Sequence, residues 1–312
     1  AVTGAISYVT SENTPIIYFA DSNSSRKLNS EYTILKSSLQ HNNFDVKLIN
    51  LAAISSIPED ATILLLAAPD RDLSLEEKNK VSDYLKGGGN AIFLFDPINS
   101  EEGYTNFDDL FEEYTVALNY DRVKENNPQR HIANRPYDIV VRPEPCDITN
   151  EQDLSKFTLI MPASTSFKRL INDKEPLTIT PLLTTSESSV GEIFGGVMTE
   201  EIPGPVDVGL IAEYNSAVNT KIAFIGNAYF VTDEAYASNY PYSQSSIQLM
   251  ALTLDWMYDK SNEVFILPKN SNYDSITLSG LNATATVVVI VLVFPILIVA
   301  AGLIIWLRRR HL

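Results

Sequence analysis

An uninterrupted apolar run near the end of the chain constrains the fold more than any other feature. Residues 287–307 read VVVIVLVFPILIVAAGLIIWL, which is 21 residues without a charge. A helix of that length spans about 31 Å, close to the hydrocarbon thickness of a bilayer. A buried core helix is seldom apolar on every side. The run therefore predicts a transmembrane helix over residues 286–307, kinked at Pro295 and in contact with the lipid bilayer.

The residues that flank this run predict its orientation. Trp306 lies where an interfacial aromatic belongs, and Arg308, Arg309 and Arg310 follow directly. Cationic residues prefer the cytoplasmic side of a membrane helix. We therefore expect residues 308–312 to form a cytoplasmic tail. Residues 269–285 would be a juxtamembrane linker, and residues 1–268 an extracytoplasmic domain.

The charge and the single cysteine exclude several classes of protein. The formal net charge is −16 at pH 7. A surface this acidic repels nucleic acid, whose binding depends on cation–phosphate contacts, so no nucleic-acid partner is expected. Cys146 is the only cysteine, which rules out a disulfide within the chain.

Short apolar runs in the first hundred residues predict a sheet. Strand-like runs cover residues 15–20, 44–50, 61–69 and 90–97, and helical patterns cover residues 29–43 and 73–89. The second helical pattern opens with Ser74 and Glu77 at the spacing of a capping box. Nearly continuous apolar strands interleaved with helices are typical of a parallel sheet covered on both faces. We therefore expect an α/β domain with a mostly parallel sheet flanked by helices. Later strand-like runs and an amphipathic helix over residues 243–259 extend it.

Three consecutive glycines, Gly87, Gly88 and Gly89, could suggest a phosphate-binding loop. Such a loop follows a strand and precedes a helix, so that helix amides point at the anion. These glycines instead follow a predicted helix and precede a strand. That is where a helix end needs a residue with positive φ. The pattern predicts a helix C-cap and no nucleotide site.

Four aspartates follow the predicted strands of the first half: Asp21, Asp70, Asp72 and Asp96. Residues that follow parallel strands gather in one crevice, where ligands usually bind. The four could therefore line a cation, sugar or small-solute site. Aspartates are also common in such loops as turn formers and helix caps, and the sequence leaves both readings open.

A basic cluster interrupts the acidic chain between residues 122 and 142. Its members are Arg122, Lys124, Arg130, His131, Arg135 and Arg142. They could form a patch that meets an anionic partner or glycan. They could equally pair with nearby acids in surface ion pairs, each of which contributes little.

No pattern of catalytic or metal-binding residues is present in the sequence. It holds three histidines and neither a His-Glu-x-x-His, a Cys-x-x-Cys nor a Gly-x-Ser-x-Gly motif. Cys146 lies in the loop sequence EPCDI, which favours a structural thiol. We expect no catalytic residue, no metal and no cofactor, and therefore no enzyme.

The order of several short motifs resembles that of the GldG-like family, the gliding-motility-type auxiliary components of ABC transporters. The motifs include ILLLAAPDRDLSLEEKNKVSDYLKGGGNAIFLFDP, NRPYDIVVRPEPCDIT, IAFIGNAYFVTDEAY and the closing Arg-Arg-Arg. The resemblance implies a fold like that of flavodoxins and class I glutamine amidotransferases. It also implies a further membrane helix and domain upstream of Ala1. Amidotransferases need a cysteine at an elbow after a central strand. Here that strand ends in LLLAAPDRD, which contains no cysteine, so amidotransferase activity is not expected.

The resemblance implies a non-enzymatic accessory subunit that works beside an ABC permease and, indirectly, its ATPase. A small-residue face made by Ala300, Ala301 and Gly302 could pack against the permease. The alternative is an extracytoplasmic carbohydrate- or solute-binding module that serves a transporter. The sequence does not identify the transported substrate.

Overall fold

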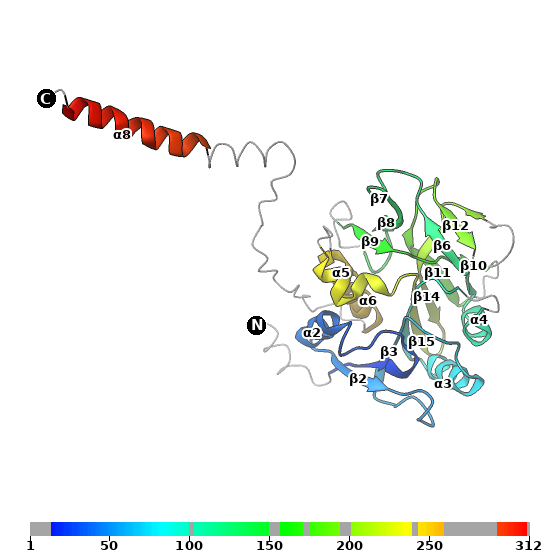
Figure 1. The fold of residues 1–312 in the computed structure, drawn as a ribbon. Helices are drawn as coiled ribbons and strands as arrows, with labels where there is room; N and C mark the ends of the chain where they lie inside the picture. Colours follow the sequence, from blue (N-terminus) through cyan, green and yellow to red (C-terminus); the bar gives the residue numbers. More distant parts are fainter. Residues whose placement is uncertain are drawn as a thin grey trace. The chain divides into compact units, whose positions relative to one another are not determined.

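The computed structural model describes residues 14–99, 103–149, 157–170, 175–193, 201–238, 243–258 and 292–310. The chain divides into two compact units, Ala1–Leu267 and Pro268–Leu312. All the described strands belong to the first unit, where they form a sheet of twelve strands and a smaller sheet of three (Figure 1).

Five neighbouring strands of the large sheet run parallel to one another. Their order across the sheet is β2-β1-β3-β4-β15, which matches a flavodoxin-like sheet whose strand order reverses between β1 and β3. Their bounds are Ile16–Ala20 (β1), Asp45–Ile49 (β2), Ala61–Ala67 (β3), Asn90–Leu94 (β4) and Asn219–Ile225 (β15).

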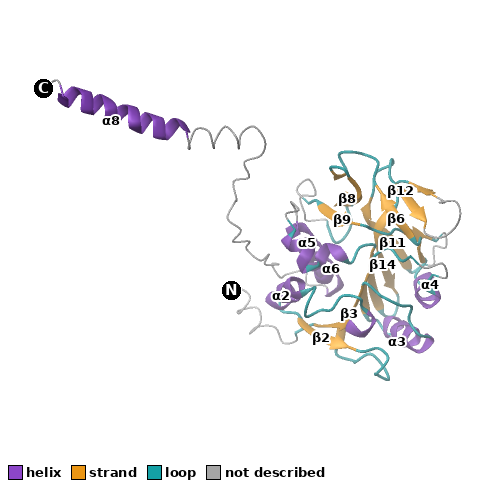
Figure 2. Cartoon of the chain, in the orientation of Figure 1, coloured by secondary structure: helices purple, strands orange, loops and turns teal. Residues whose placement is uncertain are grey.

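Helices cover both faces of this parallel part (Figure 2). Alternate residues of β3 show why: Ile63 and Leu65 belong to one buried cluster, and Leu64 and Leu66 belong to another. The first cluster includes residues of α2 (Thr33–His41) and α6 (Ser243–Tyr258), next to the short α5 (Asp233–Ala237). The second includes residues of α3 (Leu75–Lys86) and α4 (Thr105–Glu112). Both sides of β3 are therefore buried.

The ends of α3 follow the sequence prediction. Ser74 accepts a hydrogen bond from the Glu77 amide, and the Glu77 carboxylate accepts one from the Ser74 amide, which is a capping box. At the other end Gly88 has φ +93°. The Gly88 and Gly89 amides donate to the carbonyls of Leu85 and Tyr84, each at 3.0 Å. This pattern is a Schellman motif, and it confirms that the glycines cap the helix.

The prediction of a mostly parallel sheet is wrong, because the remaining strands of the large sheet pair antiparallel. β14 (Asp207–Asn215) reaches β15 through a turn of only three residues, and so short a connection forces antiparallel pairing. The other strands are β5 (Val116–Leu118), β7 (His131–Ile132), β8 (Arg135–Pro143), β9 (Leu159–Pro162), β10 (Phe167–Arg169) and β11 (Leu177–Thr184).

The small sheet, in the order β13-β12-β6, is tied to the large sheet's loops by a buried aspartate. Its strands are β6 (Asp121–Lys124), β12 (Val190–Ile193) and β13 (Glu201–Pro203). Asp121 is fully buried and accepts hydrogen bonds from the Thr165 hydroxyl and from both the amide and the hydroxyl of Ser166. Burial raises the pKa of this carboxyl, against the effect of those hydrogen bonds.

The prediction of a transmembrane helix over residues 286–307 is also wrong: among the described residues, no helix is long and apolar enough to cross a membrane. The second unit contains α8 (Phe294–Arg310), which has 17 residues and a length of about 26 Å. Pro295 is the second residue of α8, in its first turn, where a missing amide costs little. Residues 286–291 lie outside the described residues.

Candidate functional site

The crevice expected between the carboxyl ends of β1 and β3 is occupied by the chain itself. Ser24 forms an antiparallel bridge with Pro69. The amide and the hydroxyl of Ser25 both donate to the Ala68 carbonyl, at 2.8 and 3.0 Å. The segment after β1, which begins with the short helix η1 (Asp21–Asn23), therefore covers the turn after β3.

Two of the four predicted aspartates act in local turns and caps. Asp72 accepts hydrogen bonds from the amides of Asn106 (2.9 Å) and Phe107 (3.1 Å), at the start of α4. Asp21 accepts one from the Leu28 amide at 3.2 Å and lies 4.0 Å from the Lys27 ammonium. These contacts favour the turn-and-cap interpretation for both residues. Asp70 is exposed, beside the bridge at Pro69.

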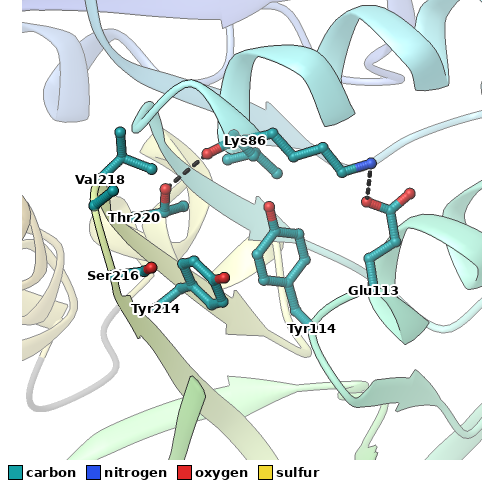
Figure 3. A pocket seen from close by; sticks show the side chains of 9 residues that line it. Lys86, Glu113, Tyr114, Tyr214, Ser216, Val218 and Thr220 are labelled. Atoms are coloured by element: carbon teal, nitrogen blue, oxygen red, sulfur yellow. Dashed lines mark hydrogen bonds and ion pairs between the residues drawn. The ribbon is translucent and has the colours of Figure 1, made fainter. Parts of the chain in front are cut away.

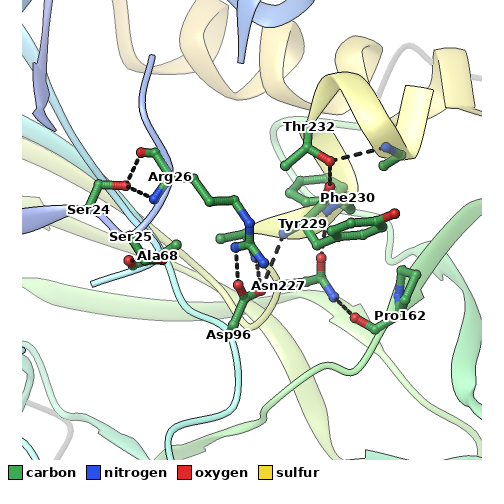
Figure 4. Close-up of polar contacts among 12 residues, drawn as sticks. Ser24, Ser25, Arg26, Ala68, Asp96, Pro162, Asn227, Tyr229, Phe230 and Thr232 are labelled. Carbon is green, nitrogen blue, oxygen red and sulfur yellow. Dashed lines mark hydrogen bonds and ion pairs between the residues drawn. The ribbon is translucent and has the colours of Figure 1, made fainter. Parts of the chain in front are cut away.

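Asp96 is different, because it lies in a pocket beyond the carboxyl ends of β4 and β15 (Figure 4). One carboxylate oxygen accepts hydrogen bonds from the amides of Ala228 (2.8 Å) and Tyr229 (3.3 Å). The other forms an ion pair with Arg26. The Arg26 guanidinium also lies 5.8 Å from the centre of the Tyr229 ring. Asp96 thus links the loops after β1, β4 and β15.

The pocket beside Asp96 has a volume of about 360 Å³. It brings together one of the predicted aspartates and two members of the predicted basic cluster, although the sequence treated these as separate sites. The lining residues are Arg26, Asp96, Pro97, Arg122, Arg135, Pro162, Ala163 and Tyr229. We call this cavity the arginine pocket, since three of its side chains are guanidinium groups.

Neighbouring side chains hold Arg122 and Arg135 in place. The Arg122 guanidinium lies over the Tyr137 ring, 3.8 Å from its centre, and 3.5 Å from the Glu192 carboxylate. Arg135 is 2.6 Å from the carboxylate of Asp138, three residues along β8. Both pairs therefore fix guanidinium groups at the pocket, on β6 and at the start of β8.

Glu192, which faces Arg122, is itself held by several donors. The Tyr137 hydroxyl donates to it at 2.8 Å, and the Lys124 ammonium lies at 3.3 Å. Burial opposes ionisation of Glu192, but the Tyr137 hydrogen bond and the two cations outweigh burial and lower its pKa. Glu192 is therefore a carboxylate at neutral pH, shared between Arg122 and Lys124.

A buried asparagine and a glycine after β15 hold lining residues of the pocket in place. The Asn227 side-chain amide donates to the Pro162 carbonyl at 2.6 Å, and its oxygen accepts from the Phe230 amide at 2.7 Å (Figure 4). Before it, the Gly226 backbone approaches so closely that an added Cβ would lie 1.9 Å from the Thr165 carbonyl oxygen. The positions of Pro162 and Tyr229 are thus set by one short segment, which includes the start of η2 (Tyr229–Val231).

The other predicted partner-binding residues do not line this pocket. The His131 ring donates through Nδ1 to the Ile132 carbonyl at 2.7 Å. Arg142 is exposed on β8, where its backbone pairs with Thr184 of β11. Arg130 is half-buried just before β7. Ala300, Ala301, Gly302, Trp306, Arg308, Arg309 and Arg310 all lie on α8 in the second unit, where Trp306 is exposed and Arg310 approaches its ring.

A second cavity, of about 450 Å³, lies at the opposite end of β15 (Figure 3). Tyr114 and Tyr214 project into it. An ion pair between Lys86 and Glu113, 2.9 Å apart, borders it, and Thr220 donates to the Leu85 carbonyl at 2.7 Å. None of the residues predicted as site candidates lines this cavity.

Sequence reasoning missed Arg26, Asn227 and Tyr229. Arg26 lies in the loop after β1. The rule that selected Asp21, namely that loops at the carboxyl ends of parallel strands line ligand sites, would have selected Arg26 as well. Asn227 and Tyr229 belong to the motif IAFIGNAYF. No local signal distinguishes them from strand-end residues, because their role depends on contacts with residues more than sixty positions away.

The described residues contain no group of three or more His, Cys, Asp or Glu side chains that could hold a metal ion. Cys146 is buried, and its amide donates to the Thr149 hydroxyl at 2.9 Å. These contacts are those of a structural residue.

Comparison with solved structures shows what the fold is similar to. The N-terminal domain of mmIFT52 aligns with a TM-score of 0.57 and 17% identity, over 78% of this chain and 96% of that domain. A ThuA-like protein from Bacteroides uniformis aligns with a TM-score of 0.44 and 10% identity, over 80% of this chain and 94% of that one. At 17% identity, the likeness to the mmIFT52 domain shows a similar fold and nothing more. The TM-score of 0.44 for the ThuA-like protein is too low to support an argument.

The search of curated proteins gave no match. A family model described as an ABC-type uncharacterized transport system matches residues 14–192, which is more than half of the chain. The matched region runs from β1 through β12 and includes Arg26, Asp96, Arg122 and Arg135 of the arginine pocket. The chain therefore belongs to the family of auxiliary components of ABC-type transport systems.

Proposed function

We propose that this protein is a non-enzymatic, GldG-like accessory subunit of its ABC-type transport system, and that the α/β domain works outside the cytoplasm beside the permease. Membership of the family supports the auxiliary role. The finer parts of the proposal rest on the turn after β3 and on the sequence motifs.

The turn after β3 supports a role without catalysis. Ala68 has φ +45°, an uncommon conformation for a residue other than glycine. Hydrolases with a nucleophile elbow place a serine in such a strained strand-to-helix turn, and amidotransferases similarly need a cysteine at an elbow after a central strand. Here β3 leads through this turn to α3, but the residue carries only a methyl group and is 3% exposed. The positive φ that an elbow needs occurs at Ala68, but this residue carries no nucleophile.

The segment that covers this turn gives a second reason. Because the Ser25 amide and hydroxyl both bond to the Ala68 carbonyl, the space that a substrate would need at the elbow is occupied by protein. The domain therefore keeps the α/β fold of such enzymes, and its surface loops are left to contact a partner.

Co-purification tests the proposal. The full chain, expressed with a candidate ABC permease from the same organism and extracted in mild detergent, should copurify with that permease. Substituting Ala300, Ala301 and Gly302 with leucine should disrupt the complex if α8 supplies the contact. A Cβ added to Gly302 would meet no atom within 4 Å, so the helix itself tolerates the change.

Two results would contradict the proposal. If the unaltered chain failed to copurify with the permease, the proposed accessory role would be contradicted. Hydrolysis of an amide or ester substrate by the purified chain would remove the non-enzymatic role. The extracytoplasmic location remains a prediction, which protease added to intact cells should test by cleaving the domain.

A further inference from the structure

The cavity of about 450 Å³ at the amino-terminal end of β15 is built by segments that are distant in sequence. Its lining comes from the ends of α3 and α4 and from the turn that joins β14 to β15. Leu85 and Lys86 are the last residues of α3, and Glu113 and Tyr114 follow α4. The rings of Tyr114 and Tyr214 project into the cavity (Figure 3), and we therefore call it the tyrosine pocket.

Two tyrosine hydroxyls distinguish this pocket. Tyr114 is 7% exposed and Tyr214 is half-buried, yet within the described residues neither hydroxyl forms a hydrogen bond. The hydroxyls of Tyr32 and Tyr120, by contrast, donate to protein oxygen atoms at 3.2 and 2.8 Å. A tyrosine hydroxyl that is withdrawn from bulk water usually finds a partner. The two hydroxyls of the pocket therefore retain hydrogen-bonding capacity that a bound molecule can use.

The protonation state of the phenols favours a ligand with hydroxyl groups. Burial raises the pKa of Tyr114, so this phenol keeps its proton at neutral pH. A protonated phenol both donates and accepts a hydrogen bond. Another hydroxyl does the same, whereas a carboxylate only accepts and an ammonium only donates. Hydroxyls are thus the groups that use the full capacity of the pair.

The rest of the lining offers apolar surface beside the two rings. Leu85 is fully buried, and Val218 is 38% exposed on the turn between β14 and β15. A hydrogen bond from the Ser216 amide to the Val218 carbonyl, at 3.2 Å, closes that turn. A lining of aliphatic and aromatic side chains is stabilised when it takes C–H surface out of water. A ligand that fits therefore has an apolar ring as well as its polar groups.

The charges of the lining cancel each other. Lys86 and Glu113 are its charged residues, and they form an ion pair at 2.9 Å. The Glu113 carboxylate also accepts from the Ser82 hydroxyl at 2.9 Å. An anionic ligand would be repelled by Glu113, and a cationic ligand would be repelled by Lys86. An uncharged ligand leaves the pair intact.

We propose that the tyrosine pocket binds an uncharged ring compound that carries hydroxyl groups, with its hydroxyls on Tyr114 and Tyr214 and its ring against the apolar lining. A pyranose sugar and a phenolic alcohol share this chemistry. The volume of about 450 Å³ lies within the range of small-molecule sites. The inference does not depend on the accessory role, since a subunit could bind a solute whether or not it contacts a permease.

Isothermal titration calorimetry on the purified full chain tests the inference with two matched pairs of probes. Methyl glucoside and para-hydroxybenzyl alcohol are uncharged, and methyl glucuronide and para-hydroxybenzoate are their anionic counterparts. At least one uncharged probe should bind with a millimolar or lower Kd, and its anionic counterpart should bind more weakly. Binding of the glucoside alone would identify a sugar site, and binding of the alcohol alone would identify a phenolic one.

Tyr114→Phe and Tyr214→Phe remove only the hydroxyls. Each should weaken the binding of that probe about fivefold, because it removes one hydrogen bond to the ligand. The Tm should stay unchanged, because in the described part of the chain these hydroxyls bond to no protein group. Tyr120→Phe is the matched control, since its hydroxyl donates to Asp108 outside the pocket. It should lower the Tm and leave the affinity unchanged.

Three results would overturn the proposal. The first is that neither uncharged probe binds at concentrations up to about 10 mM. The second is that both phenylalanine variants bind the probe as tightly as the wild type. The third is that the anionic counterpart binds as tightly as the uncharged probe.

Discussion

The buried carboxylate of Glu77 makes the stability of the domain depend on acid pH. Its side chain is 2% exposed and forms two parallel contacts with Arg71, at 2.8 and 2.9 Å. It also accepts from the Ser74 amide at 2.8 Å and from the Asn23 side chain at 3.3 Å. Although burial opposes ionisation, the Arg71 pair and these hydrogen bonds lower the pKa of Glu77 from 4.5 to about 2.

The size of the effect follows from that shift. A lowered pKa means that the folded state favours the carboxylate. Its contribution to stability is therefore complete above pH 4.5 and is lost as the pH falls toward 2. The shift corresponds to about 3 kcal/mol. Because the Arg71 side chain is 46% exposed and its charge is screened by water, we expect about 2 kcal/mol.

Urea denaturation at a series of pH values measures this contribution. Glu77→Gln should lower the free energy of unfolding at pH 7 by about 2 kcal/mol, and this deficit should shrink as the pH falls below 4.5. Glu76→Gln is the control, since it removes the same charge one residue earlier from a side chain that is 79% exposed. If the deficit of Glu77→Gln were the same at pH 7 and pH 3, the reasoning would be refuted.

Four other substitutions, at three positions, test the packing. Asp121→Ala should lower the free energy of unfolding by about 3 kcal/mol, because it leaves the buried donors of Thr165 and Ser166 without an acceptor. Asp121→Asn should cost far less at pH 7. Since burial raises the pKa of Asp121, the wild type should lose stability relative to the Asn variant as the pH rises from 3.8, which denaturation at two pH values would detect. Gly88→Ala should cost about 1 kcal/mol in thermal unfolding, because φ is +93° there. Gly226→Ala should greatly reduce the yield of folded protein, and a normal yield would contradict the close approach to Thr165.

Features that depend on neighbouring residues could be predicted from the sequence. The capping box at Ser74 and Glu77 and the glycine cap at Gly88 involve contacts within a few positions, and both are confirmed. The apolar runs of β1, β3 and β4 also identified buried strands, because burial on both faces leaves a nearly continuous apolar pattern.

Features that depend on distant residues could not be predicted in the same way. An apolar run does not record its direction, so β14 and β11 were not recognised as antiparallel. The apolar pattern of residues 287–307 likewise does not show where a helix begins, and α8 starts one residue before Pro295.

The candidate site was found only in part, for the same reason. Asp96 and Arg122 were identified separately, as an acidic crevice and a basic cluster. They meet because Arg26, seventy positions from Asp96, closes one wall and the loops after β9 and β15 close another. Pairings over such distances are set by the sheet order, which the sequence does not encode locally.

The near-contact at Gly226 has a consequence for how this domain can evolve. A single hydrogen atom in place of a side chain lets the carboxyl end of β15 touch the strand connection at Thr165, and Asn227 holds Pro162 one residue further on. Any residue larger than glycine would push those two backbones apart, and the cavity and the sheet would be disturbed together. Sequence variation is thus expected in the loops that line the arginine pocket, while Gly226 itself tolerates no larger residue.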